Sequence, residues 1–108
     1  MPDIQRRALR TFDTSGLTAN FQDVGAVISF PAWRAIFINP SDVDVLITDQ
    51  SSEEDIRVPS LGTVNISELS FANSNKRDLP LFQGNTQLQV KQVTGAGTGT
   101  LIIILLGR

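Results

Sequence analysis

The sequence contains no cysteine, no histidine and no tyrosine, and its 108 residues include one tryptophan. Without cysteine the chain forms neither disulfides nor thiolate metal sites, and without histidine it has no Ser-His or Cys-His nucleophile pair. The formal net charge is −2, too small to indicate a nucleic-acid partner. No run approaches the ~20 apolar residues that span a bilayer. We therefore expect a structural or binding protein that is not an enzyme, with no cofactor, no metal, no nucleic acid and no membrane partner.

Alternation of apolar and polar residues dominates the chain, and turn residues separate the short runs. Alternation with a period of two is typical of half-buried strands, and turn signals every 8 to 12 residues or so are typical of a β-sandwich or small barrel. No segment with helical periodicity exceeds about two turns. The sequence thus predicts an all-β fold: an antiparallel, jelly-roll-like β-sandwich of about eight short strands, with an extended N-terminal arm (residues 1–13) and a single sandwich domain (residues 14–108).

Residues 33–38 are mostly apolar on both faces, which indicates a central strand, and we expect Trp33 to lie in the core. Asn39-Pro40-Ser41-Asp42 is a favourable turn sequence, and residues 42–48 then place Val43, Val45 and Ile47 on one face. The sequence therefore predicts a hairpin between residues 33–38 and 42–48. Residues 23–30 also alternate, with Val24, Ala26, Ile28 and Phe30 on one face, and predict another strand.

The last strand is expected at residues 100–106, after a glycine-rich hairpin loop at residues 95–99 that follows the strand at residues 86–93. Its unbroken apolar run fits a strand that is covered on both faces, either by the sandwich or by a neighbouring subunit. The glycine-rich loop does not match a phosphate-binding loop, because no lysine follows and the next element is a strand.

The N-terminal residues carry the only basic cluster and show no clean apolar face, which favours an extended arm or an edge strand. Extended, about twelve residues span roughly 40 Å, far enough to cross a neighbouring subunit. In such an arm, leucine and phenylalanine would be apolar anchors and the arginines would donate to carboxylates. The alternative is a solvated arm. The candidate contacts to another subunit or a shell are Arg6, Arg7, Leu9, Arg10 and Phe12.

An acidic stretch without lysine or arginine follows the predicted turn. Two of its carboxylates, Asp42 and Asp44, are two residues apart on an expected strand and would share a face. The spacing of an EF-hand loop is absent, so a solvated acidic rim is favoured over a calcium site, and a basic partner is a third possibility. The candidate rim residues are Asp42, Asp44, Asp49, Glu53, Glu54 and Asp55.

Residues 30–41, the strand at residues 43–48, and residues 86–93 with the loop and strand that end the chain resemble small β-sandwich virion proteins of tailed bacteriophages, of the capsid decoration (cement) or collar type. The resemblance brings no active-site residues. It implies a structural protein of the virion that assembles as a symmetric homo-oligomer, a trimer or ring, and stabilises the particle. The expected function is capsid decoration.

The partners that this resemblance implies are further copies of the chain and other virion proteins such as the major capsid protein. The expected location is the capsid surface or the neck, after synthesis in the host cytoplasm. The alternatives are a head–tail, collar or tail-attached structural protein, or a carbohydrate- or receptor-binding module with a groove around Trp33. Edge strands of a small sandwich must be covered, charged or paired, and the few charges on the last strand favour self-association.

Overall fold

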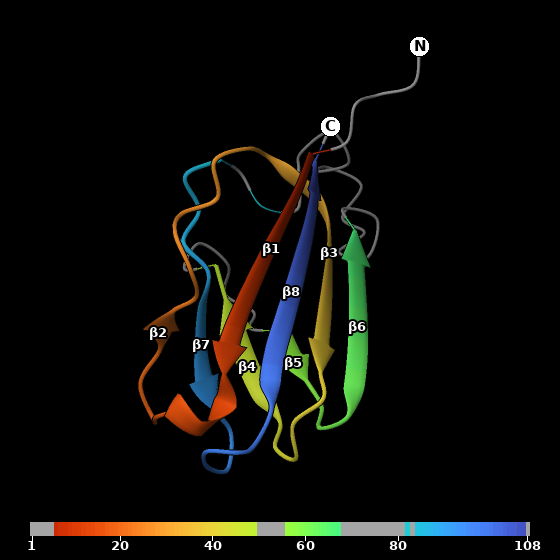
Figure 1. Cartoon of the computed structure of the whole chain (residues 1–108). Coiled ribbons are helices and arrows are strands. Elements are labelled where there is room, and N and C mark those ends of the chain that lie inside the picture. Colours follow the sequence, from red (N-terminus) through yellow and green to blue (C-terminus); the bar gives the residue numbers. More distant parts are fainter. Residues whose placement is uncertain (1–5, 50–55, 68–81, 83, 108) are drawn as a thin grey trace.

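The computed structural model describes residues 6–49, 56–67, 82 and 84–107, which form two antiparallel β-sheets packed face to face (Figure 1). The first sheet has the order β1-β8-β3-β6 and the second sheet has the order β2-β7-β4-β5. A short 3-10 helix, η1 (Thr14–Gly16), follows the first strand. No helix in this described part of the chain is long and apolar enough to cross a membrane. The strands are β1 (Arg6–Asp13), β2 (Gln22–Asp23), β3 (Ala32–Asn39), β4 (Val45–Thr48), β5 (Ile56–Val58), β6 (Gly62–Ser67), β7 (Gln89–Gln92) and β8 (Thr100–Gly107).

The strand order follows a simple rule: the numbers of four of the paired strands add up to nine with those of their partners. The pairs β1–β8 and β3–β6 lie in the first sheet, and the pairs β2–β7 and β4–β5 lie in the second sheet. This is the order of a long antiparallel ribbon rolled into two sheets, the jelly roll. The predicted all-β, jelly-roll-like sandwich with about eight strands is therefore confirmed.

The core lies between the two sheets and consists of alternate residues from each strand. In β8, Leu101, Ile103 and Leu105 are fully buried, and the residues between them are only partly buried. Phe37 of β3 and Val90 of β7 are also fully buried, from opposite sheets. Successive side chains of a strand point to opposite faces, so this alternation identifies the inner and outer face of each sheet.

The structure corrects the hairpin that was predicted between residues 33–38 and 42–48. The strand β3 pairs with β6 and β8 in the first sheet, and β4 pairs with β5 and β7 in the second sheet. The chain crosses between the sheets after Asn39, which is fully buried. The Asn39 Nδ2 group donates to the carbonyl oxygens of Val43 (2.8 Å), Val58 (3.1 Å) and Pro59 (3.1 Å). A turn sequence shows where the chain reverses, but these buried contacts direct the crossing.

The second predicted hairpin, across residues 95–99, is also wrong, because β7 and β8 lie in different sheets. The connection is bound to the segment that follows β1. The Thr14 hydroxyl donates to the Gly99 carbonyl (2.9 Å), and the Gly97 N–H donates to the Thr14 carbonyl (3.1 Å). Among the described strands that are consecutive in sequence, β4 and β5 are the pair that hydrogen-bond to each other.

The N-terminal arm is corrected for the residues that the structure describes. Arg6–Asp13 forms β1, which pairs with β8 along all eight of its residues, from Arg6 opposite Gly107 to Asp13 opposite Thr100. The predicted domain boundary after residue 13 would therefore separate β1 from β8, although the two strands belong to the same sheet. Residues 1–5 lie outside the described part. The segment forms an edge strand because its alternate residues Ala8 and Phe12 pack against the core.

Two smaller expectations also differ from the structure. Trp33 is half-buried instead of lying in the core, because the register between β3 and β8 shifts between Ala32 and Arg34. Residues 24–30 form no regular strand, although Val24, Ile28 and Phe30 are buried as expected. Gly25 interrupts this segment with a φ of +66°, in the left-handed region that breaks an extended strand.

Candidate assembly surface

The outer face of the first sheet carries a continuous group of apolar side chains. Ile36 and Ile38 alternate with buried residues of β3 and so point outward, and the same holds for the apolar outer residues of β8. Leu9 of β1 keeps 59% of its surface exposed. Figure 1 looks onto this face, with β8 at its centre. We call it the apolar outer face, and its residues are Leu9, Ile36, Ile38, Ile102, Ile104 and Leu106.

The register of the strands joins five of these residues into rows across the sheet, whereas Leu106 lies between Arg7 of β1 and Arg34 of β3. Leu9 of β1 and Ile36 of β3 both lie opposite Ile104 of β8, which makes a row of three. A second row pairs Ile38 with Ile102. Direct cross-strand neighbours have Cβ atoms about 5 Å apart, so the side chains of each row are in contact. The rows form one apolar patch.

The outer face of the second sheet has a different character. Its side chains include Gln89, which donates to Asp23 (2.8 Å), and Lys91, whose Nζ lies 4.9 Å from the centre of the Phe21 ring. Arg57 of β5 is paired with Asp44 (2.6 Å). Leu46 is an apolar residue among them. The described outer face of the second sheet is thus more polar than the apolar outer face of the first sheet.

Strand propensity alone does not account for the isoleucines of the apolar outer face. Threonine is also β-branched and also favours strands, and it is compatible with solvent. On the same face of the sheet, β6 carries Thr63 and Asn65. The central strands β3 and β8 instead carry isoleucine and leucine at these outward positions. The apolar residues are thus concentrated where two neighbouring strands flank them.

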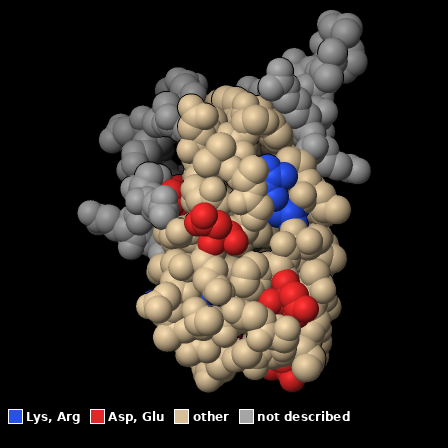
Figure 2. All heavy atoms as spheres, turned by 60° about the vertical axis from the view of Figure 1, so that its left-hand side comes forward, with Lys and Arg blue, Asp and Glu red and all other residues tan. Residues whose placement is uncertain are grey.

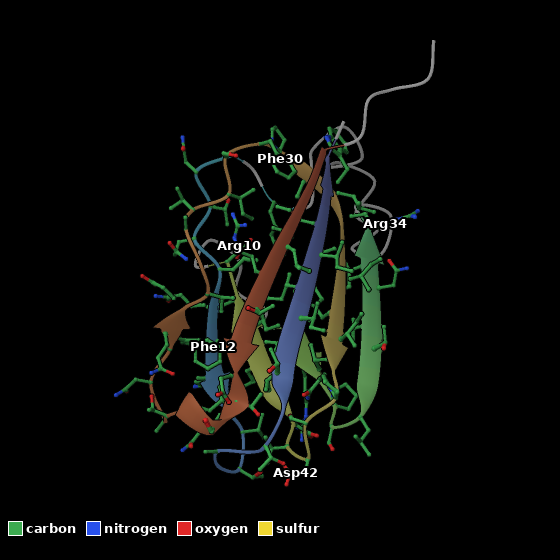
Figure 3. The ribbon with its side chains drawn as sticks, in the orientation of Figure 1. Arg10, Phe12, Phe30, Arg34 and Asp42 are labelled. Carbon is green, nitrogen blue, oxygen red and sulfur yellow. The ribbon has the colours of Figure 1, made fainter. Side chains whose placement is uncertain are left out.

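The sequence-predicted contact residues of the N-terminal segment separate onto two faces of β1. Leu9 points outward and joins the apolar outer face, as a contact surface requires. Arg10 and Phe12 point inward, toward the second sheet (Figure 3). Arg6 and Arg7 lie in β1, and their side chains are outside the described part. A contact with the outer face of β1 can therefore include Leu9. It does not include Phe12, because the Phe12 side chain packs against the core.

Arg10 is a polar residue at an inward position. Its Nε atom is buried and has no hydrogen-bond partner among the residues that the structure describes, and its Nη1 atom makes one long contact to the Leu9 carbonyl (3.4 Å). A Cβ atom at Gly25 would collide with the Arg10 Cδ atom, so glycine makes room for this side chain. The aliphatic part of Arg10 therefore lies beside Gly25, within the chain.

The described residues of the predicted acidic rim contact different parts of the chain. The Asp42 carboxylate accepts from the Thr98 N–H (2.9 Å), and the Asp44 carboxylate accepts from Arg57 and from the Ser60 N–H (2.7 Å). The two carboxylates thus bind different segments, which corrects the expectation of a shared face. Asp49 follows the opposite end of β4, whereas Glu53, Glu54 and Asp55 lie outside the described residues.

These contacts have electrostatic consequences for the first carboxylates of the stretch. The Ser60 N–H, and then the Arg57 side chain, lower the pKa of Asp44 below its ordinary value. Figure 2, which brings the β2 side forward, shows acidic side chains in separate groups divided by uncharged surface. Within the described ranges no group of three or more carboxylates could hold a metal ion.

The glycine-rich loop contributes no anion site. The Gly97 and Thr98 N–H groups donate to Thr14 and Asp42 of the same chain. Backbone groups that bind a phosphate must be free to point at it. The loop instead connects the two sheets at the end where β1 and β3 finish.

The outer residues of β3 and β8 were not singled out from the sequence as contact residues. Their signal was present, because residues 33–38 and 100–106 are apolar on both faces. Such runs indicate strands with both faces covered. The structure shows that one face of each run is covered by the second sheet and that the other belongs to the apolar outer face.

Comparisons with known proteins support the fold and leave the family open. No protein-family model matches the chain, and no curated protein matches it. A solved structure described as "Bacillus endospore appendages form a novel family of disulfide-linked pili" is similar, with a TM-score of 0.53 and 11% sequence identity. The alignment covers 95% of this chain and 85% of that chain. At this identity the likeness shows a shared β-sandwich fold.

Proposed function

We propose that this chain is a non-enzymatic structural subunit that assembles as a symmetric oligomer, and that it does so on a bacteriophage particle as a capsid decoration protein. The observation that carries the proposal is the contrast between the two outer faces. The second sheet presents paired polar and charged groups to solvent, whereas the first sheet presents a patch of isoleucine and leucine. The largest apolar patch on a soluble protein is often a functional contact site.

The placement on a phage rests on the resemblance of the sequence to small virion β-sandwich proteins. A decoration protein binds a lattice through many small interfaces, which add up through multivalency. The similar solved structure belongs to appendages described as disulfide-linked pili. This chain contains no cysteine, so any assembly that it forms is held without disulfides.

Electron microscopy tests the proposal at both of its levels. Purified full-length chain should appear as rings or other symmetric oligomers in negative stain, and antibodies raised against it should label phage particles. Label over the whole capsid supports decoration, whereas label confined to the neck or tail supports the collar or tail-attached alternative. Exclusively monomeric protein that labels no particle would contradict the proposed function.

A further inference from the structure

The dimensions of the first sheet can be compared with those of protein interfaces. The first sheet has four strands, of which three are eight residues long. At about 4.8 Å between strands and about 3.3 Å per residue, the whole outer surface of the first sheet, polar β6 included, measures about 19 by 26 Å, or about 500 Å². Two such sheets packed face to face remove about 1,000 Å² of flat surface from water, which is near the lower limit for a specific interface. The apolar outer face is the part of this contact on β1, β8 and β3.

From this geometry we infer that the apolar outer face packs against the same face of a second copy of the chain. The inference rests on the proposed function and names the contact through which the subunits associate. A sheet presents a flat surface of period-two side chains, and another sheet surface is the shape that interdigitates with it over the whole area. A second copy supplies such a surface with the same apolar composition. The result is an isologous, two-fold contact.

The charges at the ends of the face determine the relative direction of the two copies. Arg34 lies at one end, opposite Leu106 of β8, and Asp13 lies at the other end, opposite Thr100 (Figure 3 labels Arg34). With strands parallel, the Arg34 ends of both copies meet. With strands antiparallel, the Arg34 end of each copy lies over the Asp13 end of the other copy, with Arg34 on β3 and Asp13 on β1. The second arrangement is favoured because it keeps the two Arg34 side chains apart, and like charges across an interface are repelled.

The antiparallel arrangement places one row of residues on the two-fold axis. Leu9, Ile104 and Ile36 lie opposite one another and near the middle of their eight-residue strands. An axis in the plane of the interface, perpendicular to the strands, passes along this row. Ile104 of one copy therefore lies against Ile104 of the other, whereas the two Leu106 residues lie at opposite ends of the interface.

Substitution of the central residue tests whether the face is used. In sedimentation velocity, Ile104→Glu should weaken self-association at least about tenfold, because it places two carboxylates against each other in an apolar contact. Leu46→Glu introduces the same charge on the outer face of the second sheet and should leave association unchanged. Ile104→Thr keeps the β-branched shape and should weaken association less than Ile104→Glu does. Its circular dichroism spectrum should match that of the wild-type chain, which shows that the variant is folded.

The absence of natural cysteine allows single introduced cysteines to report the direction of packing. Ile104→Cys should form a cross-linked dimer with a short bis-maleimide, whereas Leu106→Cys should not. Equal cross-linking at both positions would overturn the antiparallel direction. An oligomer that neither cross-links at residue 104 nor responds to Ile104→Glu would overturn the face-to-face contact but leave the proposed function standing. A wild-type chain that stays monomeric at every concentration would overturn both.

Discussion

At the scale of single residues, Asn39 is the side chain on which the crossing between the sheets most depends. Its amide nitrogen donates to three carbonyl groups, and its oxygen accepts from the Ser41 N–H (3.2 Å) and hydroxyl. Asparagine has both donor and acceptor atoms, which no other residue of its size combines with this geometry. The sequence indicated Asn39 as a turn residue, but not that it is buried.

Replacement of Asn39 by aspartate should therefore destabilise the fold strongly. Asn39→Asp keeps the shape but removes both N–H donors and brings a carboxylate against carbonyl oxygens, at a cost of about 3 kcal/mol in the free energy of unfolding. Denaturant unfolding measures the change. Asn65→Asp, the same exchange at an exposed position of β6, is the control and should change stability little. Equal effects of both variants would show that the buried contacts of Asn39 are not what stabilises the crossing.

Asp44 makes the stability of the fold depend on pH. Its pKa is lowered from 3.8 by the Ser60 N–H first and by Arg57 second. A lowered folded-state pKa means that the contribution is complete above the unfolded value and is lost as the pH falls through the folded value. The wild-type chain should therefore lose more stability on acidification below pH 3.8 than Asp44→Asn, which does not titrate. Parallel stability curves for the two proteins, measured by denaturant unfolding across this range, would contradict the assignment.

At the scale of elements, the existence of most strands could be predicted from the sequence, but their pairing could not. Alternation identifies which residues of a strand face the core, and it placed strands at β3 and β8 and identified β3 as central. It carries no information about which strand lies alongside. In a jelly roll, consecutive strands mostly belong to opposite sheets, so the natural expectation of hairpins fails here at β3–β4 and β7–β8.

The N-terminal strand shows a second limit of reasoning from alternation. The segment appeared to lack an apolar face because Arg10 occupies an inward position between Ala8 and Phe12. Arginine counts as a charged residue in a sequence pattern, although its aliphatic part can lie against apolar groups in the folded chain. The sequence left an extended arm and an edge strand open, and the pairing with β8 along eight residues shows the edge strand.

Removal of β1 should consequently unfold the sandwich instead of releasing an arm. Deletion of residues 1–13 uncovers one edge of β8 and strips Ala8 and Phe12 from the core. We expect loss of cooperative thermal unfolding, measured by circular dichroism. Deletion of residues 1–5 alone leaves all of β1 in place and should preserve a cooperative transition. A folded, cooperative product of the longer deletion would restore the view of this segment as a separate arm.

At the scale of the whole molecule, the sandwich has two unlike surfaces. The outer face of the second sheet carries mostly polar side chains, including the Arg57–Asp44 ion pair and the Gln89–Asp23 hydrogen bond, whereas the first sheet carries the apolar outer face. The candidate contact surface was only partly visible in the sequence. Leu9 was identified, whereas the outer residues of β3 and β8 needed the sheet order to be brought together around it. A surface composed from three distant segments follows from the fold and not from any local motif.

The mass of the unmodified chain in solution tests this account most directly. One chain has a mass of 11.8 kDa. If the apolar outer face joins subunits, static light scattering on fractionated full-length protein should give a multiple of this mass, and the mass should fall on dilution. A constant mass of a single chain, from the most dilute to the most concentrated sample, would contradict it.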